Sequence, residues 1–324
     1  MELLNIYRAY RKYLIEKKKS KPYQIKFFNF WAQEMSEIWF AKFIHSRGLL
    51  DKYPKKKISF FSVFGARYVF DWNKSDIKIF FTGENLQKHF PEYSDSALSN
   101  AKINLSLGFE YLSNNPKYLR FPLWILFTHD PEYREKEIIE ATQKLSHPII
   151  RKRSQFASHI SSWDGTGIRR EICEALTKIE KVDCAGKFMH NDDSLRLKYN
   201  DNKITYLKNY KFNICPENSD SNGYVTEKIF QSIQAGCIPV YWGSENNPEP
   251  DILNQEAIIF WEKGGENEKV ISLIAELNQS SSKLNDFISQ PRLTKNAPEL
   301  IITMFDNLEK KLKDVIHFSK CTTS

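Results

Sequence analysis

The sequence lacks any long hydrophobic run. Hydrophobic residues make up 41% of its 324 residues, but the longest uninterrupted apolar stretch is seven residues, at positions 121–127. A membrane-spanning helix needs about 20, so we expect no transmembrane segment. The first residues also lack a basic region followed by an apolar one, and we therefore expect no secretory signal.

Cysteine is scarce and metal-binding motifs are missing. The five cysteines are odd in number, and none stands in a C-x-x-C pair. Such spacing indicates neither a disulfide framework nor a zinc site, and reduced thiols in a cytosol fit best. The pair Asp192-Asp193 is a weak metal signal and is more typical of a loop.

Positive charge is only slightly in excess. Lys and Arg total 47 against 40 Asp and Glu, a net charge of +7. The densest clusters, at 17–21 and 55–57, are most simply solvated surface, although an anionic membrane surface or a polyanionic partner would also suit them. They are too short to indicate nucleic acid, and no zinc-finger or RNA-binding signature accompanies them.

What the sequence does contain is an alternation of short apolar runs with amphipathic stretches. This pattern predicts parallel sheets with helical crossovers, and the length suggests two domains. The polar stretch 146–162 reads as the boundary between them. The predicted strands are 25–30, 58–64, 77–81, 182–186, 210–215, 238–242 and 257–261, and the predicted helices are 133–145, 168–179, 227–235 and 301–316.

One segment combines a strand, a polar loop and a helix start in an order suited to ligand binding. The strand ends at Cys215, and Thr226 can cap the helix that follows. Ligands bind beyond the carboxyl ends of parallel strands, and a helix N-terminus attracts phosphate. Lys228 lies in the first turn, where the helix dipole disfavours a cation. A bound anion would explain this lysine, and an ordinary surface lysine explains it equally well.

The same segment resembles the signature of the α-1,3/4-fucosyltransferases. The matching pieces are 217–219 (ENS), 224–228 (YVTEK) and 235–243 (AGCIPVYWG), and upstream 80–85 (FFTGEN) is similar to a motif of bacterial members. The resemblance implies an α/β protein of GT-B type, with two Rossmann-like domains facing across a cleft. It assigns 1–150 to acceptor binding, 151–299 to GDP-fucose binding, and 300–324 to a helix that packs back toward the N-terminal domain.

The resemblance also implies roles for individual residues. Glu84 would be the general base, although a loop or cap carboxylate is the simpler reading of the residue alone. Arg169 and Lys228 would meet the diphosphate, although Arg169 reads equally well as an exposed helix residue. Glu227 would face the fucose and act in catalysis. The implied donor-binding set is Arg169, Asn213, Asn218, Tyr224, Glu227 and Lys228.

The implied reaction moves L-fucose from GDP-fucose, with inversion, to a GlcNAc hydroxyl of an N-acetyllactosamine-like oligosaccharide, most simply through an α-1,3 bond in a Lewis-type surface glycan. No D-x-D motif occurs, so we expect no required cofactor and a divalent metal that is at most stimulatory. Pro216 and Ser161-Ser162 depart from the family pattern.

We expect a cytoplasmic location, with weak peripheral contact at the inner face of the bacterial membrane, and no nucleic-acid partner. Two alternatives stay open. One is a GT-B transferase that uses another nucleotide sugar, and the other is a non-catalytic glycan-binding protein.

Overall fold

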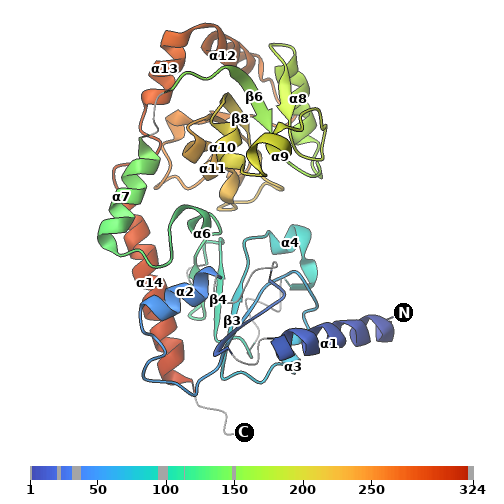
Figure 1. The fold of residues 1–324 in the computed structure, drawn as a ribbon, viewed down its shortest axis with the longest axis vertical. Helices are drawn as coiled ribbons and strands as arrows, with labels where there is room; N and C mark the ends of the chain where they lie inside the picture. Colours follow the sequence, from blue (N-terminus) through green and yellow to red (C-terminus); the bar gives the residue numbers. More distant parts are fainter. Residues whose placement is uncertain are drawn as a thin grey trace. The chain divides into compact units, whose positions relative to one another are not determined.

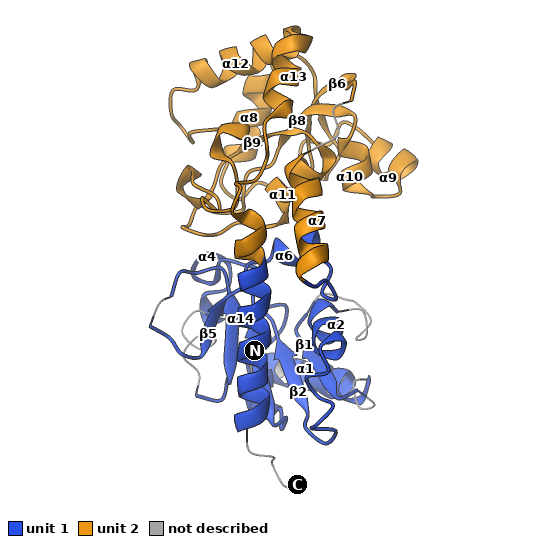
Figure 2. Cartoon of the chain, turned by 90° about the vertical axis from the view of Figure 1, so that its left-hand side faces the viewer, with its two compact units in different colours: residues 1–134, 302–324 blue, residues 135–301 orange. Residues whose placement is uncertain are grey.

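The computed structural model describes residues 2–19, 23–30, 38–93, 101–112, 114–147 and 151–319. The chain forms two compact units, Met1–Arg134 with Ile302–Ser324 and Glu135–Ile301 (Figure 2). The division therefore falls at 134/135, where the sequence suggested 150, because helix α7 (Glu135–Ser146) groups with the second unit. Among the described helices, none combines the length and apolar character needed to cross a membrane.

The first unit is built on a five-stranded parallel sheet in the order β1-β2-β3-β4-β5; Figure 1 labels the neighbouring strands β3 and β4. Ile25, Ile58 and Ile77 lie in register across the first three strands. Apolar residues predominate on both faces, as expected of a covered parallel sheet, and Lys26, Ser59 and Lys78 form the one polar row of these strands. Its strands are β1 (Ile25–Phe28), β2 (Ile58–Phe61), β3 (Ile77–Phe81), β4 (Leu105–Gly108) and β5 (Tyr118–Arg120), and its helices are α1 (Glu2–Lys19), α2 (Trp39–Ser46), α3 (Val69–Trp72), α4 (Leu86–His89) and α6 (Ile125–Thr128).

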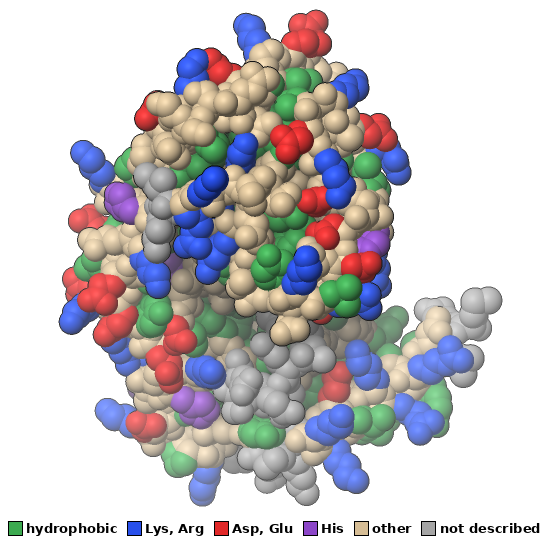
Figure 3. Space-filling model, turned by 45° about the horizontal axis from the view of Figure 1, so that its top comes forward, with side chains coloured by type: hydrophobic (Ala, Val, Ile, Leu, Met, Phe, Trp, Pro, Cys, Tyr) green, Lys and Arg blue, Asp and Glu red, His purple; other side chains and the backbone are tan. Residues whose placement is uncertain are grey.

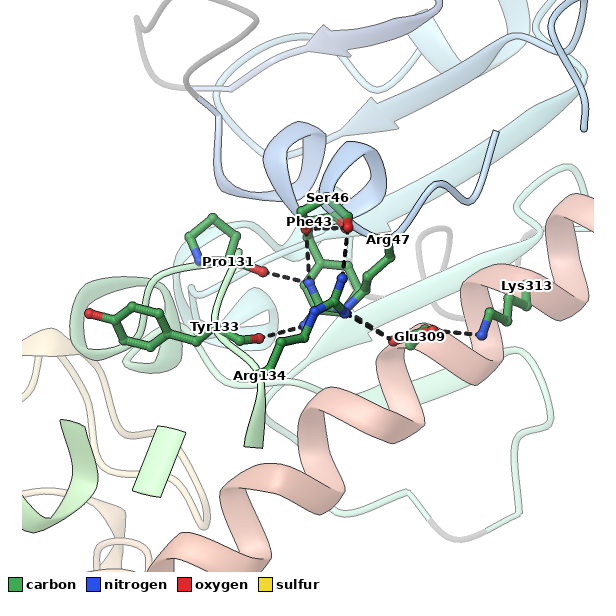
Figure 4. A network of polar contacts seen from close by, with 8 residues as sticks. All are labelled: Phe43, Ser46, Arg47, Pro131, Tyr133, Arg134, Glu309 and Lys313. Carbon is green, nitrogen blue, oxygen red and sulfur yellow. Dashed lines mark hydrogen bonds and ion pairs between the residues drawn. The ribbon is translucent and has the colours of Figure 1, made fainter. Parts of the chain in front are cut away.

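The final helix, α14 (Ala297–Phe318), belongs to the first unit from residue 302 onward. Arg47 connects α14 to the rest of the first unit (Figure 4). Its Nε donates to Glu309 of α14 at 3.1 Å, and its Nη atoms donate to the carbonyls of Pro131 at 2.6 Å and Tyr133 at 3.0 Å. The guanidinium also lies over the Phe43 ring, 3.6 Å from its centroid. One buried side chain thus joins α2, the segment before the unit boundary and α14.

The second unit carries a second parallel sheet, in the order β10-β9-β8-β6-β7. The chain runs from β6 outward to β7 and then returns to the other side of β6 for β8, so the strand order reverses between β6 and β8. Ligands bind at such a switch point, outside the carboxyl ends of the strands. The strands are β6 (Gln155–His159), β7 (Val182–Cys184), β8 (Tyr210–Ile214), β9 (Ile238–Tyr241) and β10 (Ile259–Phe260), and the helices besides α7 are α8 (Ile168–Thr177), α9 (Ser194–Tyr199), α10 (Lys203–Leu207), α11 (Glu227–Ala235), α12 (Glu268–Gln279) and α13 (Ser281–Ser289).

The reading of 146–162 as a boundary is wrong, because it contains the central strand β6. Ser158 and His159 make the segment look polar, yet both are buried. Their polar atoms bond inside the sheet: Ser158 Oγ donates to the carbonyl of Asp183 at 3.1 Å, and His159 Nδ1 lies 2.9 Å from the carbonyl of Ile214. A polar side chain that is satisfied in this way can occupy a core strand.

Candidate active site

A pocket opens at the switch point of the second unit, where β6 and β8 end and α11 begins. Three cations and one carboxylate line it, so its charge favours an anion. Four of the six predicted donor-binding residues are part of this wall. The lining residues are His159, Ile160, Ser161, Arg169, Lys203, Leu207, Asn213, Ile214, Cys215, Pro216, Glu227, Lys228 and Gln231.

Helix α11 runs from Glu227 to Ala235, as predicted, between Thr226 and Gly236, whose φ of 75° is typical of a helix C-terminus. The expected side-chain cap is wrong, however. The Thr226 hydroxyl accepts from no backbone N–H of the helix and instead donates to Glu217 Oε2 at 2.8 Å. The Thr226 backbone N–H donates to Glu217 Oε1, also at 2.8 Å. A carboxylate from the preceding loop therefore holds both polar groups of the residue that precedes α11.

The same carboxylate holds Lys228. Glu217 is 0% exposed, and its Oε2 lies 3.1 Å from Lys228 Nζ, which also lies 2.9 Å from the Thr226 hydroxyl. Burial acts to lower the pKa of the Lys228 ammonium, but the charges of Glu217 and Glu227 outweigh it and raise the pKa. Lys228 is therefore a fixed, fully protonated cation in the pocket wall.

Glu227, beside it, is an ionised carboxylate. Burial acts to raise its pKa, but the neighbouring Lys228 and the hydrogen bonds at the start of α11 lower it overall. The pocket therefore presents adjacent negative and positive groups at one helix N-terminus. Such a pair can bind a sugar hydroxyl and a phosphate side by side.

The structure distinguishes Arg169 from its neighbour Arg170. Arg169 is 3% exposed, whereas Arg170 points outward and pairs with Glu174 at 3.2 Å. The Nη2 of Arg169 donates to Asn218 Oδ1 at 2.6 Å, and its Nη1 donates to the carbonyl of Trp163. Burial lowers the pKa of the guanidinium, which still stays protonated at neutral pH. Arg169 is thus a buried, oriented cation, and the interpretation of it as an exposed helix residue is wrong.

The other three predicted donor-binding residues differ in position. Asn213 lies on β8 and lines the pocket. Asn218 and Tyr224 are not part of the pocket lining among the described residues. Asn218 reaches the site through its bond to Arg169, and Tyr224 is buried at 1% exposure. Asn218 is therefore placed to orient Arg169 in the pocket wall.

Sequence reasoning did not find His159 in the pocket. Burial lowers its pKa to about 4, so the ring is neutral and carries one N–H. The Ile214 carbonyl can only accept, which places the proton on Nδ1, and Nε2 then accepts from the Ser161 hydroxyl at 2.7 Å. This neutral ring adds no charge, and it orients the Ser161 oxygen at the pocket. The strand pattern around β6 was too weak to reveal either residue.

A left-handed turn after β9 supports the loop that carries Glu217. Ser244, Glu245 and Asn246 all have φ between 50° and 54°, a conformation that costs about 1–2 kcal/mol per residue. Ser244 Oγ accepts from the N–H of Gly223 at 3.1 Å. At Gly243 a Cβ would lie 2.9 Å from the Glu217 side chain, so only glycine fits. This close contact with Glu217 explains why the 235–243 motif ends in glycine.

Glu84 lies in the first unit, just beyond the carboxyl end of β3. The Thr82 hydroxyl accepts from the Glu84 N–H at 3.0 Å, and Asn85 caps α4 by accepting from Lys88 N at 3.2 Å. A Cβ at Gly83 would lie 2.6 Å from Leu123, so the turn must carry glycine there. Glu84 itself is half-buried. These bonds fix the backbone at Glu84, and a carboxylate at a strand end can accept a proton from a bound hydroxyl.

Two sequence families match most of the chain. Residues 25–127 match the Alpha-(1,3)-fucosyltransferase FucT N-terminal domain, and residues 149–295 match the Glycosyltransferase family 10 (fucosyltransferase) C-terminal domain.

The described residues contain no group of three or more His, Cys, Asp or Glu side chains that could hold a metal ion.

Individual relatives agree with these matches. Alpha-(1,3)-fucosyltransferase FucT of Helicobacter pylori is 31% identical over 193 residues, which are 52% of this chain and 37% of that protein. A putative fucosyltransferase-like protein of Arabidopsis thaliana is 37% identical over 99 residues, 30% of this chain and 18% of the relative. The chain thus spans well under half the length of these relatives.

Solved structures support the fold. A crystal structure of an alpha1,3-fucosyltransferase superposes with a TM-score of 0.57 at 22% identity and covers 89% of each chain. The crystal structure of an alpha1,3-fucosyltransferase with GDP-fucose gives 0.54 at 23% identity, again over 89% of each chain. The two parallel sheets thus belong to a fold of GT-B type.

Proposed function

This chain belongs to glycosyltransferase family 10, the fucosyltransferases, and we propose that it transfers L-fucose from GDP-fucose to a GlcNAc hydroxyl of an N-acetyllactosamine-like acceptor. The observation that carries the proposal is the pocket at the β6/β8 switch point, whose wall holds Arg169, Lys203 and Lys228 against the single carboxylate of Glu227. This surplus of cations suits the two charges of a nucleoside diphosphate.

The diphosphate would lie between Arg169 and the N-terminus of α11. Arg169 is buried and oriented, and it offers donors in a planar fork that matches phosphate oxygens. Lys228 contributes a point charge, and the α11 N-terminus contributes its dipole. As the bond to the sugar breaks, negative charge grows on the leaving phosphate, and cations already in place stabilise it without reorganising. Glu227 would hold the fucose hydroxyls.

The acceptor hydroxyl would lose its proton to Glu84. Its oxygen forms a bond to C1 of fucose, the bond between C1 and the phosphate oxygen breaks, and GDP leaves with that electron pair. Attack from the face opposite the diphosphate turns a β-linked donor into an α-fucoside. A carboxylate at a strand end of the first unit suits the role of general base in this displacement.

The finer parts of the proposal are the α-1,3 bond, a Lewis-type surface glycan, and transfer without a required metal. The last of these is tested by activity in the presence of a chelator. A cytoplasmic location stays a prediction.

The test is incubation with GDP-fucose and a panel of type 1 and type 2 disaccharides, with the product linkage read by NMR. An α-1,3 fucoside on GlcNAc of a type 2 disaccharide supports the proposal. A product linked elsewhere would correct the acceptor. Consumption of a different nucleotide sugar would correct the donor.

The two alternatives are separated by ligand stabilisation. GDP should raise the melting temperature more than UDP or ADP, whereas a transferase specific for another nucleotide sugar would reverse that order. A glycan-binding protein without turnover would be stabilised by a glycan and would leave GDP-fucose intact in every mixture. Retention of both Glu84 and Glu227 argues against it, because a binder needs neither.

A further inference from the structure

Helix α1 (Glu2–Lys19) packs on the first unit through one side only. Tyr13 is 2% exposed, its ring lies 5.5 Å from that of Phe28 and 5.8 Å from that of Trp72, and its hydroxyl donates to the Trp72 carbonyl at 3.0 Å. Tyr10 adds an edge-on contact with Trp72 at 5.1 Å. These aromatic contacts fix the rotation of α1 about its axis and thereby decide which residues face away from the unit.

The outward face carries large apolar side chains. Steps of three, four and seven connect residues 7, 11, 14, 15 and 18, so these residues share one face of the helix. The three apolar ones among them are Tyr7, Leu14 and Ile15, which are 58%, 42% and 54% exposed. A lone exposed apolar residue needs no explanation, but a row of them along one helix marks an interaction surface.

Cations lie within and beside this row. Arg11 and Lys18 share its face, and Arg8 lies at its edge. In its 18 residues α1 carries six Lys or Arg and two Glu, an excess of +4, which is more than half of the net +7 of the whole chain. In Figure 3, basic and hydrophobic side chains alternate along the segment that extends to the right, which is α1.

We propose that the outward face of α1, made by Tyr7, Arg8, Arg11, Leu14, Ile15 and Lys18, docks on an anionic lipid surface. An interfacial helix buries apolar side chains at the boundary of the headgroups and acyl chains, while Lys and Arg on the same helix meet lipid phosphates. The tyrosine suits this depth because its ring is apolar and its hydroxyl is polar. The long stems of Arg11 and Lys18 let their charges reach the headgroups while the row between them is buried.

The charge selects lipid over the other possible occupants. A second copy of this chain would bring the same +4 excess against α1, and the two faces would repel. Nucleic acid would use the cations but would leave Leu14 and Ile15 in water. An anionic membrane satisfies both components of the face. This inference does not depend on the proposed transferase activity.

The test is flotation of the full chain with vesicles of phosphatidylcholine alone or of equal parts phosphatidylcholine and phosphatidylglycerol. The protein should float with the anionic vesicles and not with the neutral ones, and added salt should release it. A variant with Arg8, Arg11 and Lys18 changed to Gln should bind about a hundredfold more weakly, since each cation near such a surface contributes roughly fivefold. A variant with Tyr7, Leu14 and Ile15 changed to Ser should bind about tenfold more weakly or worse.

The matched control changes three exposed lysines elsewhere, Lys178, Lys269 and Lys310, to Gln. It removes the same charge and should bind like the wild type. If the control and the α1 charge variant lose vesicle binding equally, the proposal is overturned, because the binding would then depend on the net charge of the protein and not on α1. Equal flotation with neutral vesicles would overturn it too. A dimer that the serine variant converts to a monomer would assign the face to a second copy instead.

Discussion

Replacing Lys228 by Ala leaves a fully buried carboxylate without its cation. Glu217 is 0% exposed and accepts from the Thr226 N–H, the Thr226 hydroxyl and Lys228 Nζ at 2.8, 2.8 and 3.1 Å. Removing one partner of a buried ion pair typically costs about 3–5 kcal/mol. Because the Lys228 side chain is 23% exposed, water can replace part of its contact. We therefore expect about 3 kcal/mol and a fall in melting temperature of about 6–12 °C.

The second variant of this series removes both charges. Glu217→Gln combined with Lys228→Ala leaves neither ion of this pair, so it should be more stable than Lys228→Ala alone, by about 1–3 kcal/mol. It should not recover GDP affinity, since the pocket still lacks its cation. Stability and binding therefore separate in the double variant. Lys269→Ala, on the exposed side of α12, is the control and should change neither property.

The assay is thermal denaturation with and without GDP for the four proteins. The reasoning is refuted if Lys228→Ala melts within a degree or so of the wild type, or if the double variant melts lower than the single one. Either result would mean that the fold does not depend on the ion pair between Lys228 and Glu217 for its stability. Unchanged GDP stabilisation in Lys228→Ala would remove this lysine from the diphosphate site while leaving the fold argument intact.

Three further predictions concern catalysis, the donor and pH. Glu84→Gln should lose about 10²–10⁴ in kcat with GDP binding unchanged, and transfer near the wild-type rate would exclude it as the base. Arg169→Ala should weaken GDP binding by about 1.5–3 kcal/mol in a calorimetric titration, whereas Arg170→Ala, which removes an exposed cation paired with Glu174, should leave it unchanged. Burial lowers the pKa of His129 and His159 to about 4. Between a pH of about 6.5, the ordinary pKa of histidine, and a pH of about 4, the unfolded chain binds protons that the folded chain does not. The free energy of unfolding should therefore fall as the pH falls through this window. Urea denaturation at about pH 7 and about pH 5 checks this, and a variant with both histidines changed to Gln should show a flatter dependence.

Several elements follow from local sequence patterns. The starts of β1, β2 and β3 were predicted at Ile25, Ile58 and Ile77, because branched and aromatic runs between polar segments are strong strand signals. Helix α11 has the predicted bounds, since a threonine precedes it and a glycine follows it. These strand and helix predictions are confirmed, because each depends on neighbours in the chain. The ligand site expected beyond the strand that ends at Cys215 stays a prediction.

The sequence by itself determined the family, the α/β class and the segments that carry the chemistry. Only the tertiary structure decided which residues of those segments are buried and which meet. It separated Arg169 from Arg170 and placed β6 where the polar residues suggested a boundary. It also showed that the Thr226 hydroxyl donates to Glu217 instead of capping α11. Burial and hydrogen-bond partners come from elements far apart in the chain, as when a loop carboxylate contacts a helix start nine residues later. Spacing along the sequence does not contain that information.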